Sequence, residues 1–169
     1  MDFMELALAR YSVRKYKDTP IDEETLGLIL ESGRIAPTAG NRQPHRVMVV
    51  QSAEALAKID ACTRSRNGAP LALVVCYDRD ACWVRPVDGE NSGQVDASII
   101  TTHMMLEAQY LGLGSLWVMH FDPTILIEQF ALADNIVPVA ILMLGYPTDD
   151  CAPTERHNDR MTIEQMLIS

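Results

Sequence analysis

The chain has 169 residues, of which 48% are hydrophobic and 22% are charged. This composition is typical of one ordinary globular domain and excludes a fibrous or disordered protein, so we predict a single domain over residues 1–169. Lysine and arginine number 14 against 23 aspartates and glutamates, a net charge of −9 that argues against a nucleic-acid partner.

Hydrophobic periodicity predicts helices and strands that alternate along one unit without repeats. Helices are expected over residues 2–9, 22–33, 54–61, 92–111 and 123–131, and strands over 47–50, 71–77, 115–119 and 137–144. The first two helices carry apolar stripes that are typical of helices packed on a core. A polar tail from residue 151 ends in a short amphipathic segment after residue 160. This order favours a three-layer α/β or α+β sandwich.

The longest expected helix, 92–111, is apolar almost all round. One side of it carries Val95, Ile99, Thr102, Leu106 and Gln109. A helix of this kind is expected to lie buried at the centre of a protein. Gly112 and Gly114 end the helix, and because they precede a strand and lack a third glycine they do not predict a dinucleotide-binding loop.

The four cysteines match neither a zinc-ligand spacing nor a short redox motif, so we expect reduced thiols and a cytoplasmic protein. The first residues lack a basic region, and no apolar run approaches the roughly 18 residues of a membrane span, so neither secretion nor a membrane location is predicted. His103 and Glu107 lie one helical turn apart, but two ligands without a third do not predict a metal site. No pairing of residue types predicts a catalytic nucleophile.

A first candidate site follows the first helix, where Arg10, Ser12 and Arg14 occupy alternate positions. In an extended chain their side chains point to the same side, and two guanidiniums with a hydroxyl fit a phosphate group. The alternative is a solvated basic edge shared with Lys15 and Lys17, which the spacing alone favours. Residues 86–155 contain no lysine or arginine, so an anion would have to bind in the first third of the chain or at one of six later arginines: Arg64, Arg66, Arg79, Arg85, Arg156 and Arg160.

A second candidate site is the turn-rich loop of residues 36–45, which is dense in hydrogen-bonding groups and leads into a strand. Such a loop either binds a planar polar ligand or simply connects a helix to a strand, and the second explanation leaves Asn41 and Gln43 unaccounted for. Asp96 in the long helix needs a partner if it is buried. A simple first-turn acid at the start of that helix is the favoured alternative.

Taken together, these segments resemble the FMN-dependent nitroreductase family. Residues 9–16 look like the phosphate-binding segment of that family, and residues 36–44 are similar to its Pro-Ser-Ala-x-Asn-x-Gln-Pro loop, with Thr38 in place of serine. Residues 96–114 look like its long dimer-forming helix with a Gly-Leu-Gly end, and residues 144–147 resemble its late strand exit. Arg160 and the four residues after it resemble its C-terminal segment.

The resemblance implies an α+β nitroreductase-like three-layer sandwich, with a mixed central sheet flanked by helices and a domain-swapped C-terminal tail. It also implies an obligate homodimer with two FMN sites in the subunit interface. The implied activity is ping-pong chemistry, in which NADH or NADPH reduces the flavin and a nitroaromatic, quinone or similar electrophile then takes the electrons.

By the same resemblance, ten residues are expected to bind the cofactor. Arg10, Ser12 and Arg160 would hold the FMN phosphate, and Arg14 would lie nearer the pyrimidine edge of the ring. The other subunit would contribute Pro37, Thr38, Ala39 and Asn41. Met119 and His120 would lie beside flavin N5.

The chain departs from the family pattern in two places. His120 stands where larger members carry glycine, so its backbone amide can still contact N5 while its side chain narrows the pocket. The helical excursion that covers the flavin in larger members is reduced here to the loop 79–92, and either feature could shape specificity. Two other functions remain open: a flavin sensor or store with little turnover, and a flavin-free interaction protein that kept the fold.

Overall fold

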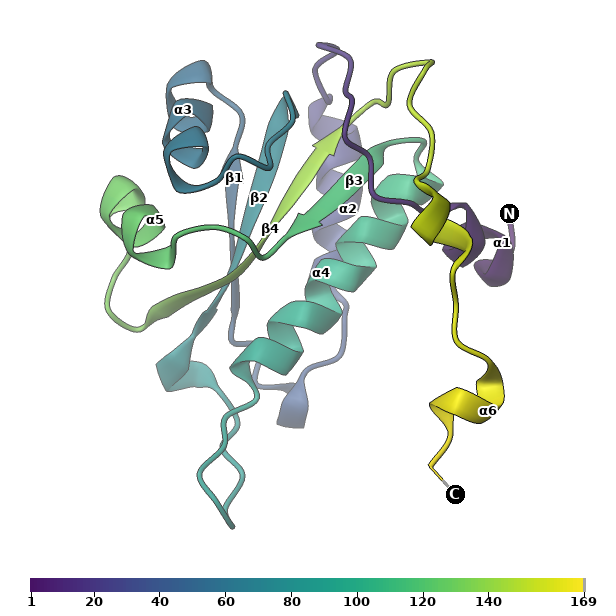
Figure 1. The fold of residues 1–169 in the computed structure, drawn as a ribbon. Helices are drawn as coiled ribbons and strands as arrows, with labels where there is room; N and C mark the ends of the chain where they lie inside the picture. The colour runs from purple at the N-terminus through teal and green to yellow at the C-terminus, as the bar shows by residue number, and fades with distance from the viewer. Residues whose placement is uncertain (169) are drawn as a thin grey trace.

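A four-stranded sheet forms the centre of the computed structural model, which describes residues 1–168 (Figure 1). Its strands are β1 (His45–Val50), β2 (Leu71–Asp78), β3 (Gly114–Val118) and β4 (Ile136–Gly145), in the order β1-β2-β4-β3. All three strand pairs are antiparallel. The expected mixed sheet is therefore not found among these four strands. In the described chain, parallel pairing occurs at one isolated bridge, between Ser12 and Ser115.

Helices cover both faces of this sheet. Helices α2 (Glu23–Arg34) and α4 (Gly93–Tyr110) lie on one face, and α3 (Ala53–Cys62) and α5 (Pro123–Phe130) lie on the other. Alternate residues of β2 point to opposite sides, so Leu73 joins one apolar core and Val74 joins the other. The expected α+β three-layer sandwich is confirmed.

The predicted elements form within one or two residues of the expected bounds because their end signals are local. Asp2, Asp22, Ser52 and Asp122 are N-caps whose side chains accept backbone N–H groups of the first helical turn. Strand β1 starts two residues earlier than expected, since His45 and Arg46 pair with Tyr77 and Cys76 on β2. That pairing is a tertiary contact which the hydrophobic pattern does not reveal.

Two expectations about burial were wrong for the single chain. Helix α1 (Phe3–Ala9) has no buried residue, and Phe3 is 67% exposed. Helix α4 buries only the face that carries Ala97, Ile100 and Met104, while Val95 on the predicted apolar side is 62% exposed. Both helices have the predicted apolar periodicity, but part of each apolar face points outward instead of into the core of this chain.

These exposed faces border an apolar groove of about 590 Å³ between α1, α2 and α4. Its apolar lining includes Phe3, Leu6, Ile35, Leu106 and Tyr110. The C-terminal tail, with the short helix α6 (Ile163–Met166), runs out beyond the body of the domain (Figure 1). Met161, Ile163 and Met166 on this tail are each more than 60% exposed.

The four cysteines are free thiols, and burial raises the pKa of the Cys76 thiol to about 12. Within residues 1–168, no helix combines the length and the apolar character needed to cross a membrane.

The segment after α1 is fixed to the edge of the sheet by close packing at Gly114. Val13 is 1% exposed, and its N–H donates to the carbonyl of Ser115 at 2.9 Å. A Cβ on Gly114 would lie 2.8 Å from the Val13 Cβ, closer than two such atoms can approach. The packing therefore requires glycine at the start of β3.

We expect Gly114→Ala to lower the free energy of unfolding in urea by about 1–3 kcal/mol, because an added methyl group overpacks this contact. Gly27→Ala is the matched control. No atom lies within 4 Å of a Cβ at Gly27 in α2, so that variant should gain up to about 1 kcal/mol from helix propensity. Equal stability of Gly114→Ala and the parent would contradict the docking of Val13.

Candidate functional site

Four arginines from the two ends of the chain converge on one pocket of about 230 Å³. Arg10 and Arg14 come from the segment after α1, while Arg156 and Arg160 come from the tail around η3 (Glu155–Asn158). The remaining lining residues are Tyr11, Ser12, Thr154 and His157. The structure thus brings together the predicted residues Arg10, Ser12, Arg14 and Arg160.

Aromatic packing and hydrogen bonds hold the tail against the N-terminal segment. The Tyr11 and His157 rings meet edge to face, with centroids 6.3 Å apart, and His157 Nε2 lies 3.0 Å from the carbonyl oxygen of Leu8. The Tyr11 hydroxyl donates to the carbonyl of Cys151 at 3.2 Å. Burial and this hydrogen bond raise the pKa of Tyr11, so the hydroxyl keeps its proton and remains a donor.

The pocket concentrates positive charge that is not neutralised inside the described chain. The six ion pairs found in residues 1–168 involve other lysines and arginines, such as Lys15 with Asp150. The guanidinium of Arg160 donates to the carbonyls of Arg156 at 3.2 Å and Asp159 at 2.8 Å, which orients it without cancelling its charge. Arginine forks beside a hydroxyl suit the oxygens of a phosphate group. In a chain of net charge −9, this cluster is the strongest candidate for an anion site.

The second predicted site is the loop that carries η1 (Ala39–Asn41), and its backbone is strained. Gly40, Asn41 and Gln43 have φ values of 56°, 53° and 51°, in the left-handed region. Side chains other than glycine adopt that region only when surrounding contacts enforce it, and such strain clusters at functional sites. Here the Thr38 hydroxyl accepts the Gln43 N–H at 3.0 Å, and the Asp96 carboxylate accepts the Ala39 N–H at 2.9 Å.

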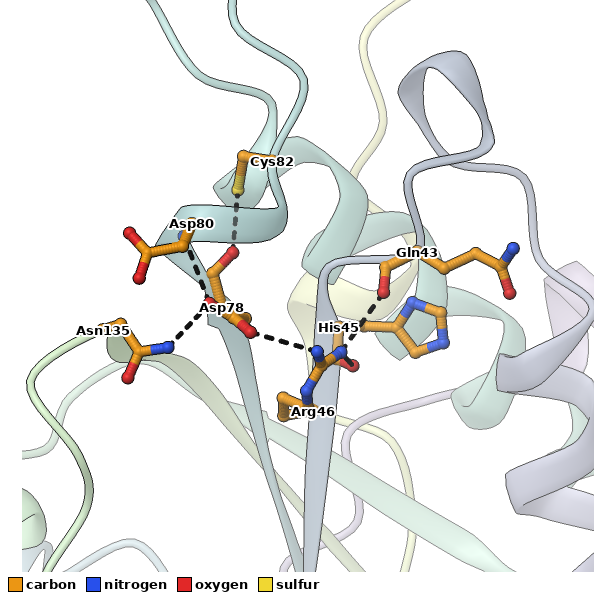
Figure 2. A network of polar contacts seen from close by, with 7 residues as sticks. All are labelled: Gln43, His45, Arg46, Asp78, Asp80, Cys82 and Asn135. Atoms are coloured by element: carbon orange, nitrogen blue, oxygen red, sulfur yellow. Dashed lines mark hydrogen bonds and ion pairs between the residues drawn. The ribbon is translucent and has the colours of Figure 1, made fainter.

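A polar network fixes the far end of this loop to β2 (Figure 2). The guanidinium of Arg46 donates to the carbonyls of Gln43 and His45, at 3.2 and 2.8 Å, and to the Asp78 carboxylate at 3.1 Å. Asp78 also accepts from the Asn135 amide at 2.8 Å. These donors, Asn135 first, hold the pKa of Asp78 below its usual range. The network ties the end of the loop to β1, to Asp78 at the end of β2 and to Asn135, which directly precedes β4.

Met119 and His120 lie just past β3 and are exposed. His120 lines a polar pocket of about 520 Å³ together with Thr63 and Arg64, and its carbonyl accepts the Thr63 hydroxyl at 2.6 Å. No hydrogen bond within residues 1–168 uses the His120 N–H, which leaves that donor open to a ligand.

The predicted residues therefore fall into separate places within one chain. Ala39 lies beside Asp96 in the first turn of α4, while Ser12 pairs with Ser115 just beyond the other end of that helix. A helix of 18 residues is about 27 Å long, so the loop and the arginine pocket are far apart within the chain.

Sequence reasoning named Arg156 only among several possible anion ligands, and it missed Tyr11, Thr154 and His157. Tyr11 lies inside the predicted phosphate segment and could have been found there. Thr154 and His157 carried no signal, because only the folding of the tail onto α1 brings them to the site.

The three-layer fold and the arginine-lined pocket define the class of protein as a small α+β domain with a candidate anion site. The chain belongs to the nitroreductase family, whose family model matches residues 7–78 and 64–146.

Individual relatives match over most of their length. A crystal structure of a nitroreductase family protein from Clostridium difficile 630 is 44% identical, with a TM-score of 0.94 over 99% of this chain and 98% of that one. An FMN-dependent nitroreductase from Clostridium difficile R20291 is 26% identical, with a TM-score of 0.78 over 94% of each chain. A protein of Archaeoglobus fulgidus, provisionally named NADH dehydrogenase/NAD(P)H nitroreductase, is 32% identical over 87% of this chain and 86% of its own.

The network around Asp78 leads to a pH-dependent prediction. Because the pKa of Asp78 is lowered in the folded protein, the ionised carboxylate stabilises the fold above its unfolded pKa, and this contribution is lost as the pH falls through the folded pKa. Asp78→Asn should therefore lower the urea midpoint at pH 7. The difference from the parent should shrink below about pH 4.

Asp88→Asn is the control, since it removes the same charge from a local, exposed pair with Arg85. It should leave the urea midpoint almost unchanged. A midpoint for Asp78→Asn that equals that of the control at pH 7 would show that the network does not stabilise the loop.

Proposed function

We propose that the protein is an FMN-dependent oxidoreductase that uses NADH or NADPH to reduce nitroaromatic compounds, quinones or similar electrophiles. Membership of the nitroreductase family and the similarity to an FMN-dependent nitroreductase support this proposal. The observation that carries it is the pocket in which Arg10, Arg14, Arg156 and Arg160 meet Ser12 without neutralising carboxylates in the described chain.

The residues of this pocket fit the phosphate of FMN by charge and by donor type. Arg10, Ser12 and Arg160 would hold the phosphate, Arg156 would add a further guanidinium, and Arg14 would lie nearer the pyrimidine edge. A nearby guanidinium stabilises the negative charge that reduced flavin carries at N1. When bound, FMN would supply the hydride and electron transfer between nicotinamide and acceptor, so the protein would need no nucleophile of its own.

NADH or NADPH and the acceptor would bind one after the other in the same cleft beside the flavin. The kinetics would therefore be ping-pong. The open N–H of His120 would donate to flavin N5, with Met119 beside it, while the imidazole limits the space above the ring. The loop 79–92 would cover the flavin. In this chain it is a hairpin-like arm in which Val84 pairs with Asn91, and Val87 in the arm is 85% exposed.

The distance between the two sites supports a homodimer. FMN is shorter than α4, so a flavin held at the arginine pocket would receive Pro37, Thr38, Ala39 and Asn41 from a second subunit. The exposed apolar side of α4, the groove beside α1 and the apolar tail are surfaces that a partner would cover. We therefore propose that the tail crosses to the partner and that both flavins lie in the interface.

The visible absorption spectrum of the purified protein, before and after incubation with FMN, is the primary test. A protein that gains no flavin spectrum would contradict the proposed function and favour a flavin-free interaction protein. A protein that binds FMN, is reduced by NAD(P)H and is not reoxidised by any quinone or nitroaromatic compound would instead be a sensor or store.

We expect Arg10→Ala and Arg160→Ala each to weaken FMN binding by roughly 10- to 150-fold, since each change removes charge-assisted hydrogen bonds of about 1.5–3 kcal/mol. Fluorescence titration of FMN measures this effect. Arg34→Ala is the control, because that guanidinium pairs with Glu31 on the surface of α2. If all three variants bind FMN as tightly as the parent, the arginine pocket is not the phosphate site.

The dimer is tested by placing a charge on the exposed side of α4. Val95→Glu should shift sedimentation from dimer to monomer at low micromolar concentration and abolish FMN binding, because a carboxylate would be buried in the interface. Leu28→Glu on α2, a residue 46% exposed, should leave the dimer intact. A monomeric parent, or a Val95→Glu variant that remains dimeric, would exclude α4 as the interface.

A further inference from the structure

Asp96 is the only acidic or basic residue that is buried within residues 1–168, with 1% of its surface exposed. One carboxylate oxygen accepts the Ala39 N–H at 2.9 Å, and the other accepts the Ser92 hydroxyl at 2.7 Å. Burial of a carboxylate is costly unless its hydrogen bonds are made. The sequence favoured a simple acid in the first helical turn. That interpretation is incomplete, because Asp96 also makes a tertiary contact with Ala39, which lies 57 positions away in the sequence.

Ala39 lies in the strained loop that also carries Thr38 and Asn41. Inside the loop, the Asn41 N–H donates to the Thr38 carbonyl at 2.9 Å, and the Arg42 N–H donates to the Ala39 carbonyl at 3.1 Å. These bonds hold the turn together but do not attach it to the rest of the subunit. In the described chain, Asp96 is the one side chain from another element that hydrogen-bonds the backbone of residues 38–42.

The position of Asp96 links this loop to the proposed dimer interface. Its neighbour Val95 is 62% exposed on the outer side of α4, while Asp96 points inward to the loop. Successive residues of a helix point about 100° apart. Val95 can therefore face a partner while Asp96, the next residue, faces the loop. Any movement of the helix relative to a partner would thus move the loop with it.

We propose that Asp96 is a positioning residue for the cofactor, which anchors Ala39 to α4 so that Thr38 and Asn41 face the flavin of the partner subunit. This inference rests on the proposed function. The Ala39 N–H is occupied by the carboxylate, so Ala39 serves as the anchor and hydrogen bonds to the flavin fall to its neighbours. The side-chain amide of Asn41 makes no hydrogen bond within residues 1–168 and is free for that role.

The test compares three variants in the full-length protein. Asp96→Ala removes the acceptor for Ala39, and Asp96→Asn keeps an oxygen acceptor at the same place. Ser92→Ala removes the other hydrogen bond of the carboxylate and leaves the Ala39 contact intact. Each variant is measured for FMN affinity by fluorescence titration, for the visible circular dichroism of bound FMN, for sedimentation and for thermal unfolding.

Asp96→Ala is expected to bind FMN at least 10-fold more weakly than the parent and to change the visible circular dichroism of the bound flavin, while remaining dimeric. Asp96→Asn should recover most of the affinity and the parent spectrum, and Ser92→Ala should resemble the parent. A merely structural role would lower the unfolding temperature without altering the dichroism of flavin that is fully bound.

A second route removes the donor instead of the acceptor, in case Asp96→Ala does not fold. Ala39→Pro deletes the N–H, and Thr38 already has the extended backbone, with φ −132° and ψ 156°, that a residue before proline requires. It should weaken FMN binding as Asp96→Ala does. If the parent binds FMN and either variant binds it as tightly, with the parent's dichroism, the anchoring role is wrong, whereas a parent that binds no FMN overturns the proposed function itself.

Discussion

The packing of α4 on the sheet is the constraint on which the rest of the structure depends. Ile100 and Met104 are fully buried against Leu73 and Leu142 on the sheet, so the helix cannot shift without opening the core. One end of α4 holds the strained loop through Asp96, and the other leads into β3, where Ser12 and Val13 dock. Both parts of the candidate site are therefore positioned by one helix, and part of the outer side of that helix stays exposed.

The arginine pocket depends on a different kind of contact, since it joins the two ends of the chain. Lys15 and Lys17 pair with Asp150 and Asp149, while Tyr11 and His157 pack together nearby. The paired lysines neutralise Asp149 and Asp150, which directly precede the tail. The arginines beside them remain available to a ligand, which explains how an acidic protein can offer a strongly positive pocket.

The loop 36–44 combines backbone strain with attachment to the rest of the chain at two points. The Arg46–Asp78 network ties its end to β1 and β2, and Asp96 ties its middle to α4. Backbone held in the left-handed region at Asn41 and Gln43 costs free energy that these contacts offset. A cofactor that must be held in a fixed orientation benefits from a loop that is already rigid before the cofactor binds.

The sequence by itself determined the secondary structure and the layered fold class, and it marked Arg10, Ser12 and Arg14 as a candidate anion segment. These follow from local signals: apolar periodicity, N-caps such as Asp22 and Asp122, and the alternation of Arg10, Ser12 and Arg14. Only the tertiary structure decided that Arg156 and His157 meet Tyr11, that Asp96 is buried against Ala39, and that α1 and one side of α4 stay exposed. The reason is physical: periodicity reports that a face is apolar, but which surface covers it, and which distant polar groups meet, depends on how the whole chain packs.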